Sequence, residues 1–179
     1  MTGAAAFAAW AGAAIIVLAD GRRGLSVGIA LIGAGFAAMA GLAGDWFGAA
    51  ALLVGGGVCA IQLLRTGRHD WGLMPPGSTA RLILAVVGGI LSLWLAASVT
   101  TGAGAPLRFA CIAVLGLMAA RLLQAQKAFQ VLTASAGLAI ALAGASALGR
   151  SAPGLAPYLA AAVIAAGALL LPNQESRAA

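Results

Sequence analysis

Seven long apolar segments, separated by short stretches that carry most of the charged residues, dominate this sequence. They cover 3–19, 25–43, 46–64, 82–99, 107–123, 131–148 and 158–171. A helix needs about 20 apolar residues to cross a hydrocarbon layer about 30 Å thick, with a range of about 17 to 25. The seventh segment is long enough only if its helix begins near Leu155, with Pro157 in a first turn that needs no N–H. The pattern predicts an all-α, polytopic transmembrane helix bundle with about seven spans, or six spans and an interfacial or re-entrant tail.

The composition supports the same prediction, because 63% of the residues are hydrophobic and only 8% are charged. A soluble domain needs roughly a quarter of its residues charged to cover its surface. We therefore expect one integral membrane domain over 1–179, surrounded by membrane lipid. Its parts are a three-helix front half at 3–64, a cytoplasmic loop at 65–81 that contains His69 and the Pro75-Pro76-Gly77 breaker, and the later helices at 82–171.

The basic residues predict the orientation. The formal net charge is +6, but the ten Lys and Arg residues lie singly or in pairs at the ends of apolar segments, which is typical of membrane topology and not of a nucleic-acid site. With the N-terminus outside, the inner side has Arg22, Arg23, Arg65, Arg68, Arg81, Arg121, Lys127 and Arg177, and the outer side has Arg108 and Arg150. Short cytoplasmic loops retain basic residues, so we expect the C-terminus inside.

Amphipathic rings prefer the membrane boundaries. On this basis Trp46, Phe47 and Tyr158 are predicted at the outer boundary, and Trp71 and Phe129 near the inner one. The bias toward Ala, Gly and Arg, with Lys127 as the single lysine, indicates a GC-rich bacterial coding sequence. The expected location is therefore a bacterial inner membrane.

Small residues at four-residue spacing predict close helix pairs, since helices in lipid associate largely through close backbone approach. The chain is so rich in Ala and Gly that such spacings also arise by chance. Three consecutive glycines in the third segment either admit a neighbouring backbone or mark a bend or π-bulge. The candidate packing residues are Gly33, Gly41, Gly55, Gly56, Gly57, Gly88, Ser92, Gly137 and Ala141.

The sequence contains no recognisable catalytic, cofactor-binding or metal-binding site. Its four acidic residues, Asp20, Asp45, Asp70 and Glu175, all fall in loops or the tail, so no ionisable group is expected in the middle of a span. Cys59 and Cys111 form no CxxC motif and are expected to act as small hydrophobes. We therefore predict that the protein is not an enzyme and has no cofactor.

The order of the first three segments resembles the J-type core membrane subunit of respiratory complex I and its relatives. It consists of an outside N-terminus, a basic inner turn at 20–24, a second helix, a tight outer turn at Gly44-Asp45 and a third helix rich in small residues. The resemblance covers about residues 3–64. It implies a π-bulge near Gly55, but the aromatic residue of the family is missing at 52–58, and the family usually has five spans.

Three functions are compatible with these features. The first is a non-enzymatic accessory or scaffold subunit of a larger inner-membrane complex, in contact with other membrane subunits or with copies of itself. The second is a small transporter or channel for a neutral or apolar solute, and the third is a J-like subunit of a complex I-type assembly. The polar lining of a transporter would come from Ser92, Ser98, Thr133, Ser135 and Ser146.

Overall fold

The computed structural model describes residues 1–65, 79–102, 104–148 and 154–167. Within these residues the chain forms seven α-helices, which confirms the all-α bundle. Their bounds are α1 Thr2–Leu18, α2 Arg22–Leu42, α3 Trp46–Arg65, α4 Thr79–Val99, α5 Ala105–Gln124, α6 Ala128–Ser146 and α7 Leu155–Gly167.

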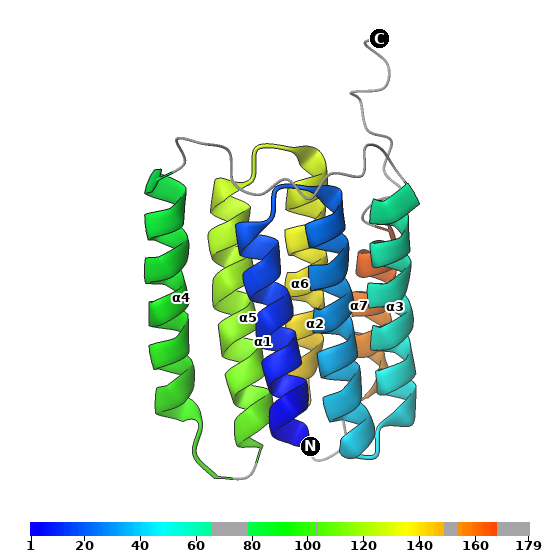
Figure 1. Cartoon of the computed structure of the whole chain (residues 1–179). Helices are drawn as coiled ribbons and strands as arrows, with labels where there is room; N and C mark the ends of the chain where they lie inside the picture. The colour runs from blue at the N-terminus through cyan, green and yellow to red at the C-terminus, as the bar shows by residue number, and fades with distance from the viewer. Residues whose placement is uncertain (66–78, 103, 149–153, 168–179) are drawn as a thin grey trace.

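The helices run side by side in alternating directions, so that the turns between them lie at two opposite ends of the bundle (Figure 1). We call these the Asp20 end, which has the α1–α2 and α5–α6 turns, and the Asp45 end, which has the N-terminus and the α2–α3 and α4–α5 turns. Among the described basic residues, Arg108 belongs to the Asp45 end. The Asp20 end has Arg22, Arg23, Arg65, Arg81, Arg121 and Lys127.

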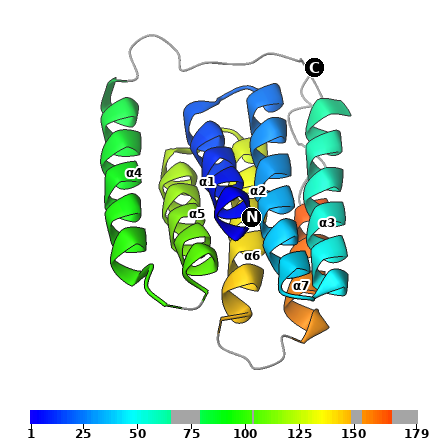
Figure 2. The same ribbon diagram turned by 60° about the horizontal axis from the view of Figure 1, so that its bottom comes forward.

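Four of the described helices, α2, α3, α5 and α6, are long and apolar enough to cross a membrane. Shorter apolar helices cover Thr2–Leu18, Val86–Ser98 within α4, and Leu155–Gly167. Of the four long helices, α2 and α6 have the largest share of buried residues. Helix α4 lies at one edge, chiefly against α5, and α3 lies at the other (Figure 2). The edge position of α4 leaves large apolar side chains of this helix exposed, and Trp94 is 72% exposed.

Helix α2 approaches both of its chain neighbours through glycine. A Cβ atom added at Gly12 of α1 would lie 2.5 Å from the Gly28 carbonyl oxygen, and one added at Gly28 would lie 2.7 Å from that of Gly12. On the other side of α2, a Cβ at Gly33 would lie 3.2 Å from the Gly56 Cα. The backbones are thus close enough for dispersion and weak Cα–H···O contacts, which are the main attractions available between helices in lipid.

The three consecutive glycines lie within a continuous α-helix, so the structure has close approach there and no π-turn. Gly55 faces α7, where an added Cβ would lie 2.6 Å from the Ala162 Cα, and Gly56 faces α2. A Cβ at Gly57 would meet nothing within 4 Å. Each of the three therefore has a different environment.

The remaining candidate packing residues have looser surroundings or contact side chains. A Cβ at Gly41 or Gly88 would meet its nearest atom at 3.7 Å, which is ordinary contact. At Gly137 it would lie 2.8 Å from the Met118 sulfur. Ser92 of α4 contacts α5, since a Cβ added at Gly116 of α5 would lie 2.9 Å from the Ser92 Cβ. Ala141 is fully buried.

Two helix boundaries differ from those that hydropathy alone predicts. Residues 124–130 read as a polar connection, but α5 continues through Gln124 and α6 already begins at Ala128. The reason is local, since the Gln130 side-chain oxygen accepts hydrogen bonds from the backbone N–H groups of Gln126 (3.1 Å) and Lys127 (3.3 Å). Helix α7 begins at Leu155 with Pro157 in its first turn, as expected. Most of the predicted 65–81 loop lies outside the described residues.

Candidate functional site

Two clusters of polar side chains lie at opposite ends of the bundle. The first, at the Asp20 end, joins the α1–α2 turn to α5 and α6. The Arg121 guanidinium donates from Nη2 to Asp20 Oδ1 at 2.8 Å and to the Ala19 carbonyl oxygen at 2.9 Å. The Gln130 side-chain nitrogen donates to the same Asp20 oxygen at 3.1 Å. Residues about a hundred positions apart in the chain thus share one carboxylate.

Arg121 was expected among the basic residues of the inner side, and the structure adds that its side chain is buried. Its side chain is 2% exposed, and that of Asp20 is 20% exposed. A buried charge is tolerated only when it is paired and hydrogen-bonded. The cluster therefore closes this end of the bundle by fixing α5 and α6 to the α1–α2 turn. The sequence held only a weak signal for it, an arginine inside the last turn of an apolar segment.

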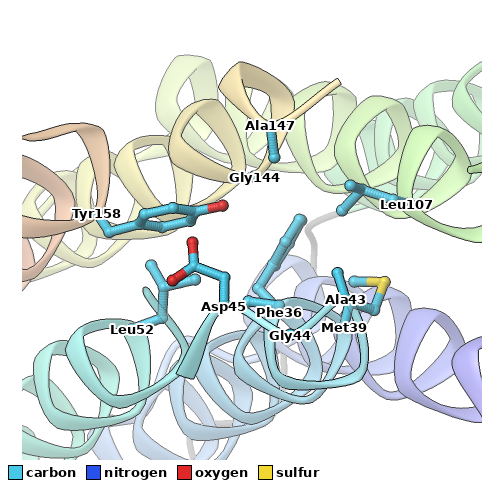
Figure 3. Close-up of a pocket in the computed structure, with 11 residues that line it drawn as sticks. Phe36, Met39, Ala43, Gly44, Asp45, Leu52, Leu107, Gly144, Ala147 and Tyr158 are labelled. Carbon is cyan, nitrogen blue, oxygen red and sulfur yellow. The ribbon is translucent and has the colours of Figure 1, made fainter. Parts of the chain in front are cut away.

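The second cluster, at the Asp45 end, borders a cavity of about 400 Å³ between α2, α3, α5, α6 and α7. Most of its wall is apolar and includes Phe36, Leu52 and Leu107 (Figure 3). Its side-chain polar groups are the Asp45 carboxylate, from the α2–α3 turn, and the Tyr158 hydroxyl, from α7. Figure 3 shows these two side chains beside each other on one wall of the cavity.

Asp45 holds its position by capping α3. Its Oδ1 accepts a hydrogen bond from the Gly48 N–H at 2.8 Å, as side-chain oxygens do at helix N-termini. Oδ2 is buried and accepts no hydrogen bond of good geometry from the described residues, and the Tyr158 hydroxyl is the side-chain donor beside the carboxylate. Gly48 makes this arrangement possible, because an added Cβ would lie 2.7 Å from Asp45 Oδ2 and 2.9 Å from Cδ2 of Tyr158.

Tyr158 differs from its predicted place. It does lie at the same end of the bundle as Trp46 and Phe47, which are exposed, but its own side chain is 2% exposed. A ring at the lipid boundary was expected, whereas the structure turns it inward against Asp45. Its α7 helix packs against α3 and α6, and the cavity between these helices receives the ring. Hydropathy alone could not reveal which side of a short helix faces inward.

The five hydroxyl residues proposed as polar lining are distributed over α4 and α6. Four of them donate to a carbonyl oxygen of their own helix, which satisfies the hydroxyl locally. The bonds are Ser92 to Gly89 (2.9 Å), Ser98 to Leu95, Thr133 to Phe129 and Ser146 to Ala143 (each 2.7 Å). Ser135 lines a separate, apolar groove between α6 and α7, beside Pro157 and Ile164.

Cys59 and Cys111 are free and buried in the described structure, in α3 and α5. Within the residues that the structure describes, no group of three or more His, Cys, Asp or Glu side chains could hold a metal ion. Phe129, predicted near the inner boundary, is stacked under the Arg22 guanidinium, 4.5 Å from the ring centroid. Trp71 and His69 lie outside the described residues.

The long apolar helices and the polar groups held at the two ends of the bundle define a polytopic α-helical membrane protein. No protein-family model, curated protein or solved structure matches the chain.

Proposed function

We propose that this protein is a non-enzymatic accessory or scaffold subunit of a larger membrane complex, with its partners bound laterally within the bilayer. One observation carries the proposal, namely that the helices are packed backbone to backbone at glycines while large apolar side chains face outward. Gly12 and Gly28 exclude even a methyl group between α1 and α2. Such packing suits a rigid support better than a moving part, because two backbones in direct contact leave little room for either helix to shift.

Helix α4 is the favoured partner surface. It packs chiefly against α5, so most of its circumference remains available for a neighbour. Ile90 and Trp94 lie on it and are 61% and 72% exposed. Trp is enriched at the buried centres of protein interfaces.

The location and orientation are part of the same proposal, a bacterial inner membrane with the N-terminus outside. The distribution of described basic residues supports it, since the Asp20 end has most of them. Among the described basic residues, Arg108 at the Asp45 end stands against six at the Asp20 end, which are Arg22, Arg23, Arg65, Arg81, Arg121 and Lys127. This distribution favours the Asp20 end as the cytoplasmic one.

Purification in a mild detergent followed by native mass spectrometry tests the subunit role. We expect the chain to be recovered with at least one further membrane subunit or a second copy. A photocrosslinking residue at Trp94 should link to that partner, and one at Val54, which is exposed on α3 at the other edge, is the control. A stable, monodisperse monomer with crosslinks from neither position would contradict the proposal.

A transporter for a neutral or apolar solute is the second candidate, favoured by the cavity at the Asp45 end. The local hydrogen bonds of Ser92, Ser98, Thr133 and Ser146 give it less support. A J-like role is a special case of the subunit proposal. It rests on the order of the first three helices, and recovery of the chain with respiratory subunits would support it.

A further inference from the structure

We propose that the cavity at the Asp45 end binds the protonated amine of a small molecule or lipid headgroup, with Asp45 and Tyr158 as the polar contacts. The proposal goes beyond the subunit role, since the site would exist whatever the chain assembles with. It rests on the combination of a partly enclosed, mostly apolar space, a buried carboxylate oxygen that accepts no hydrogen bond of good geometry within the described structure, and two aromatic rings.

The cavity has the size and wall of a ligand site. Its volume of about 400 Å³ lies within the roughly 300–1,000 Å³ of small-molecule pockets, which are mostly apolar with a few polar groups that fix orientation. Here Phe36, Leu52 and Leu107 are available to an apolar body. The cavity adjoins the exposed α2–α3 turn, where Ala43 and Gly44 belong to its wall, so that a ligand can enter from this end.

Asp45 sets the charge of the ligand. A carboxylate oxygen removed from water is costly unless it is well hydrogen-bonded and paired, and Oδ2 of Asp45 is buried without a hydrogen bond of good geometry to the residues described. The Gly48 N–H serves only Oδ1. Of the described cations at this end, Arg108 donates to the exposed Thr101 carbonyl at 3.2 Å, and the N-terminal residue Met1 is fully exposed. Neither is part of the cavity wall. The Gly48 N–H and the Tyr158 hydroxyl are both neutral donors, so a ligand cation would supply the counter-charge that neither provides.

The aromatic groups favour an amine among cations. The Tyr158 hydroxyl can accept from an ammonium group beside Asp45, and the faces of Tyr158 and Phe36 attract a cation through their ring quadrupoles. A primary ammonium with an apolar body satisfies both walls. Two sources share that chemistry, a water-soluble organic amine and the headgroup of phosphatidylethanolamine.

The variants follow from the geometry. Asp45→Asn removes the charge, but asparagine keeps an oxygen that caps α3 as well as aspartate does. Tyr158→Phe removes the hydroxyl and keeps the ring. Ala147→Leu fills the cavity from the α6 side without changing charge. Ser135→Ala, in the separate groove, is the matched control.

Isothermal titration of the full chain in detergent with phenethylamine, and with phenethyl alcohol as its neutral analogue, gives the first arm. We expect the amine to bind wild type and Ser135→Ala alike, and about tenfold or more weaker to Asp45→Asn, because a charge-assisted contact is lost. Ala147→Leu should weaken it comparably. The alcohol should bind wild type no better than it binds Asp45→Asn.

Native mass spectrometry of the chain released from nanodiscs gives the second arm and distinguishes the two sources. The lipid headgroup is identified if wild type retains one phosphatidylethanolamine per chain and Asp45→Asn retains none. In the control nanodiscs, wild type should retain no phosphatidylglycerol. Amine binding without lipid retention identifies a soluble amine. Equal binding to wild type and folded Asp45→Asn in both arms, or no binding in either, overturns the proposal.

Discussion

The ion pair between Asp20 and Arg121 provides the sharpest test of the fold, because its two members differ in exposure. Asp20→Ala leaves the guanidinium of Arg121, whose side chain is 2% exposed, with the Ala19 carbonyl as its remaining hydrogen-bond acceptor of those described above. Arg121→Met leaves the Asp20 carboxylate, whose side chain is 20% exposed and close to the end of the bundle. Removal of one partner from a buried pair costs about 3–5 kcal/mol. Partial hydration of Asp20 lowers the loss for Arg121→Met, so we expect Asp20→Ala to be the more destabilising change.

The double variant sharpens the prediction. Replacement of a whole buried pair by apolar groups is often nearly neutral, so Asp20→Ala with Arg121→Met should be more stable than Asp20→Ala alone. A loss of about 3 kcal/mol corresponds to a fall in Tm of about 6–12 °C for a chain of this size. We expect a fall in that range for Asp20→Ala and about half of it or less for the double variant.

The free cysteines supply the assay. Cys59 and Cys111 are 0% and 2% exposed, so a thiol-reactive fluorescent dye reports unfolding of the detergent-solubilised protein as temperature rises. Arg23→Met, at an exposed arginine, is the control and should change Tm little. If Asp20→Ala were no worse than Arg121→Met, and the double variant equalled the sum of the singles, the account of a desolvated ion pair would be wrong.

Two further predictions concern packing and topology. Gly55→Ala should destabilise the protein by about 1–3 kcal/mol through overpacking against Ala162, whereas Gly57→Ala, with nothing within 4 Å, should be neutral or stabilising by up to about 1 kcal/mol; the same dye assay measures both, and equal effects would contradict the assignment of these two faces. In a background without Cys59 and Cys111, single cysteines are introduced at Thr2, Ser78 and Ser176. A membrane-impermeant thiol reagent applied to intact cells should label only the cysteine at position 2. Labelling at Ser78 would show an inverted bundle, and labelling at Ser176 together with Thr2 would show an even number of spans.

Most of the architecture could be predicted from the sequence because hydropathy and helix length are local properties. The seven apolar segments correspond to α1 to α7 within a few residues, and even the start of α7 at Leu155 followed from Pro157. The end of α5 and the start of α6 were less accessible, because Gln130 caps the turn with a side chain that hydropathy counts only as polar.

The two polar clusters could not be predicted in the same way. Asp20 and Asp45 were recognised as loop residues, but which helix each one meets depends on how the helices are arranged around α2 and α6. Arg121 and Tyr158 illustrate the limit, since a basic residue and an aromatic ring near the ends of apolar segments are expected at the membrane boundary. Both are 2% exposed.

The sequence by itself therefore determined that this is a membrane helix bundle. A chain with so few charged residues is suited to lipid, and its apolar segments have the length at which a helix crosses a bilayer and satisfies its own backbone polar groups. Only the tertiary structure decided which glycines admit a neighbouring backbone, and that Asp20 pairs with Arg121 while Asp45 borders a cavity with Tyr158. The physical reason is that crossing a membrane is a property of each segment. Close approach, ion pairing and cavities arise between segments far apart in the chain.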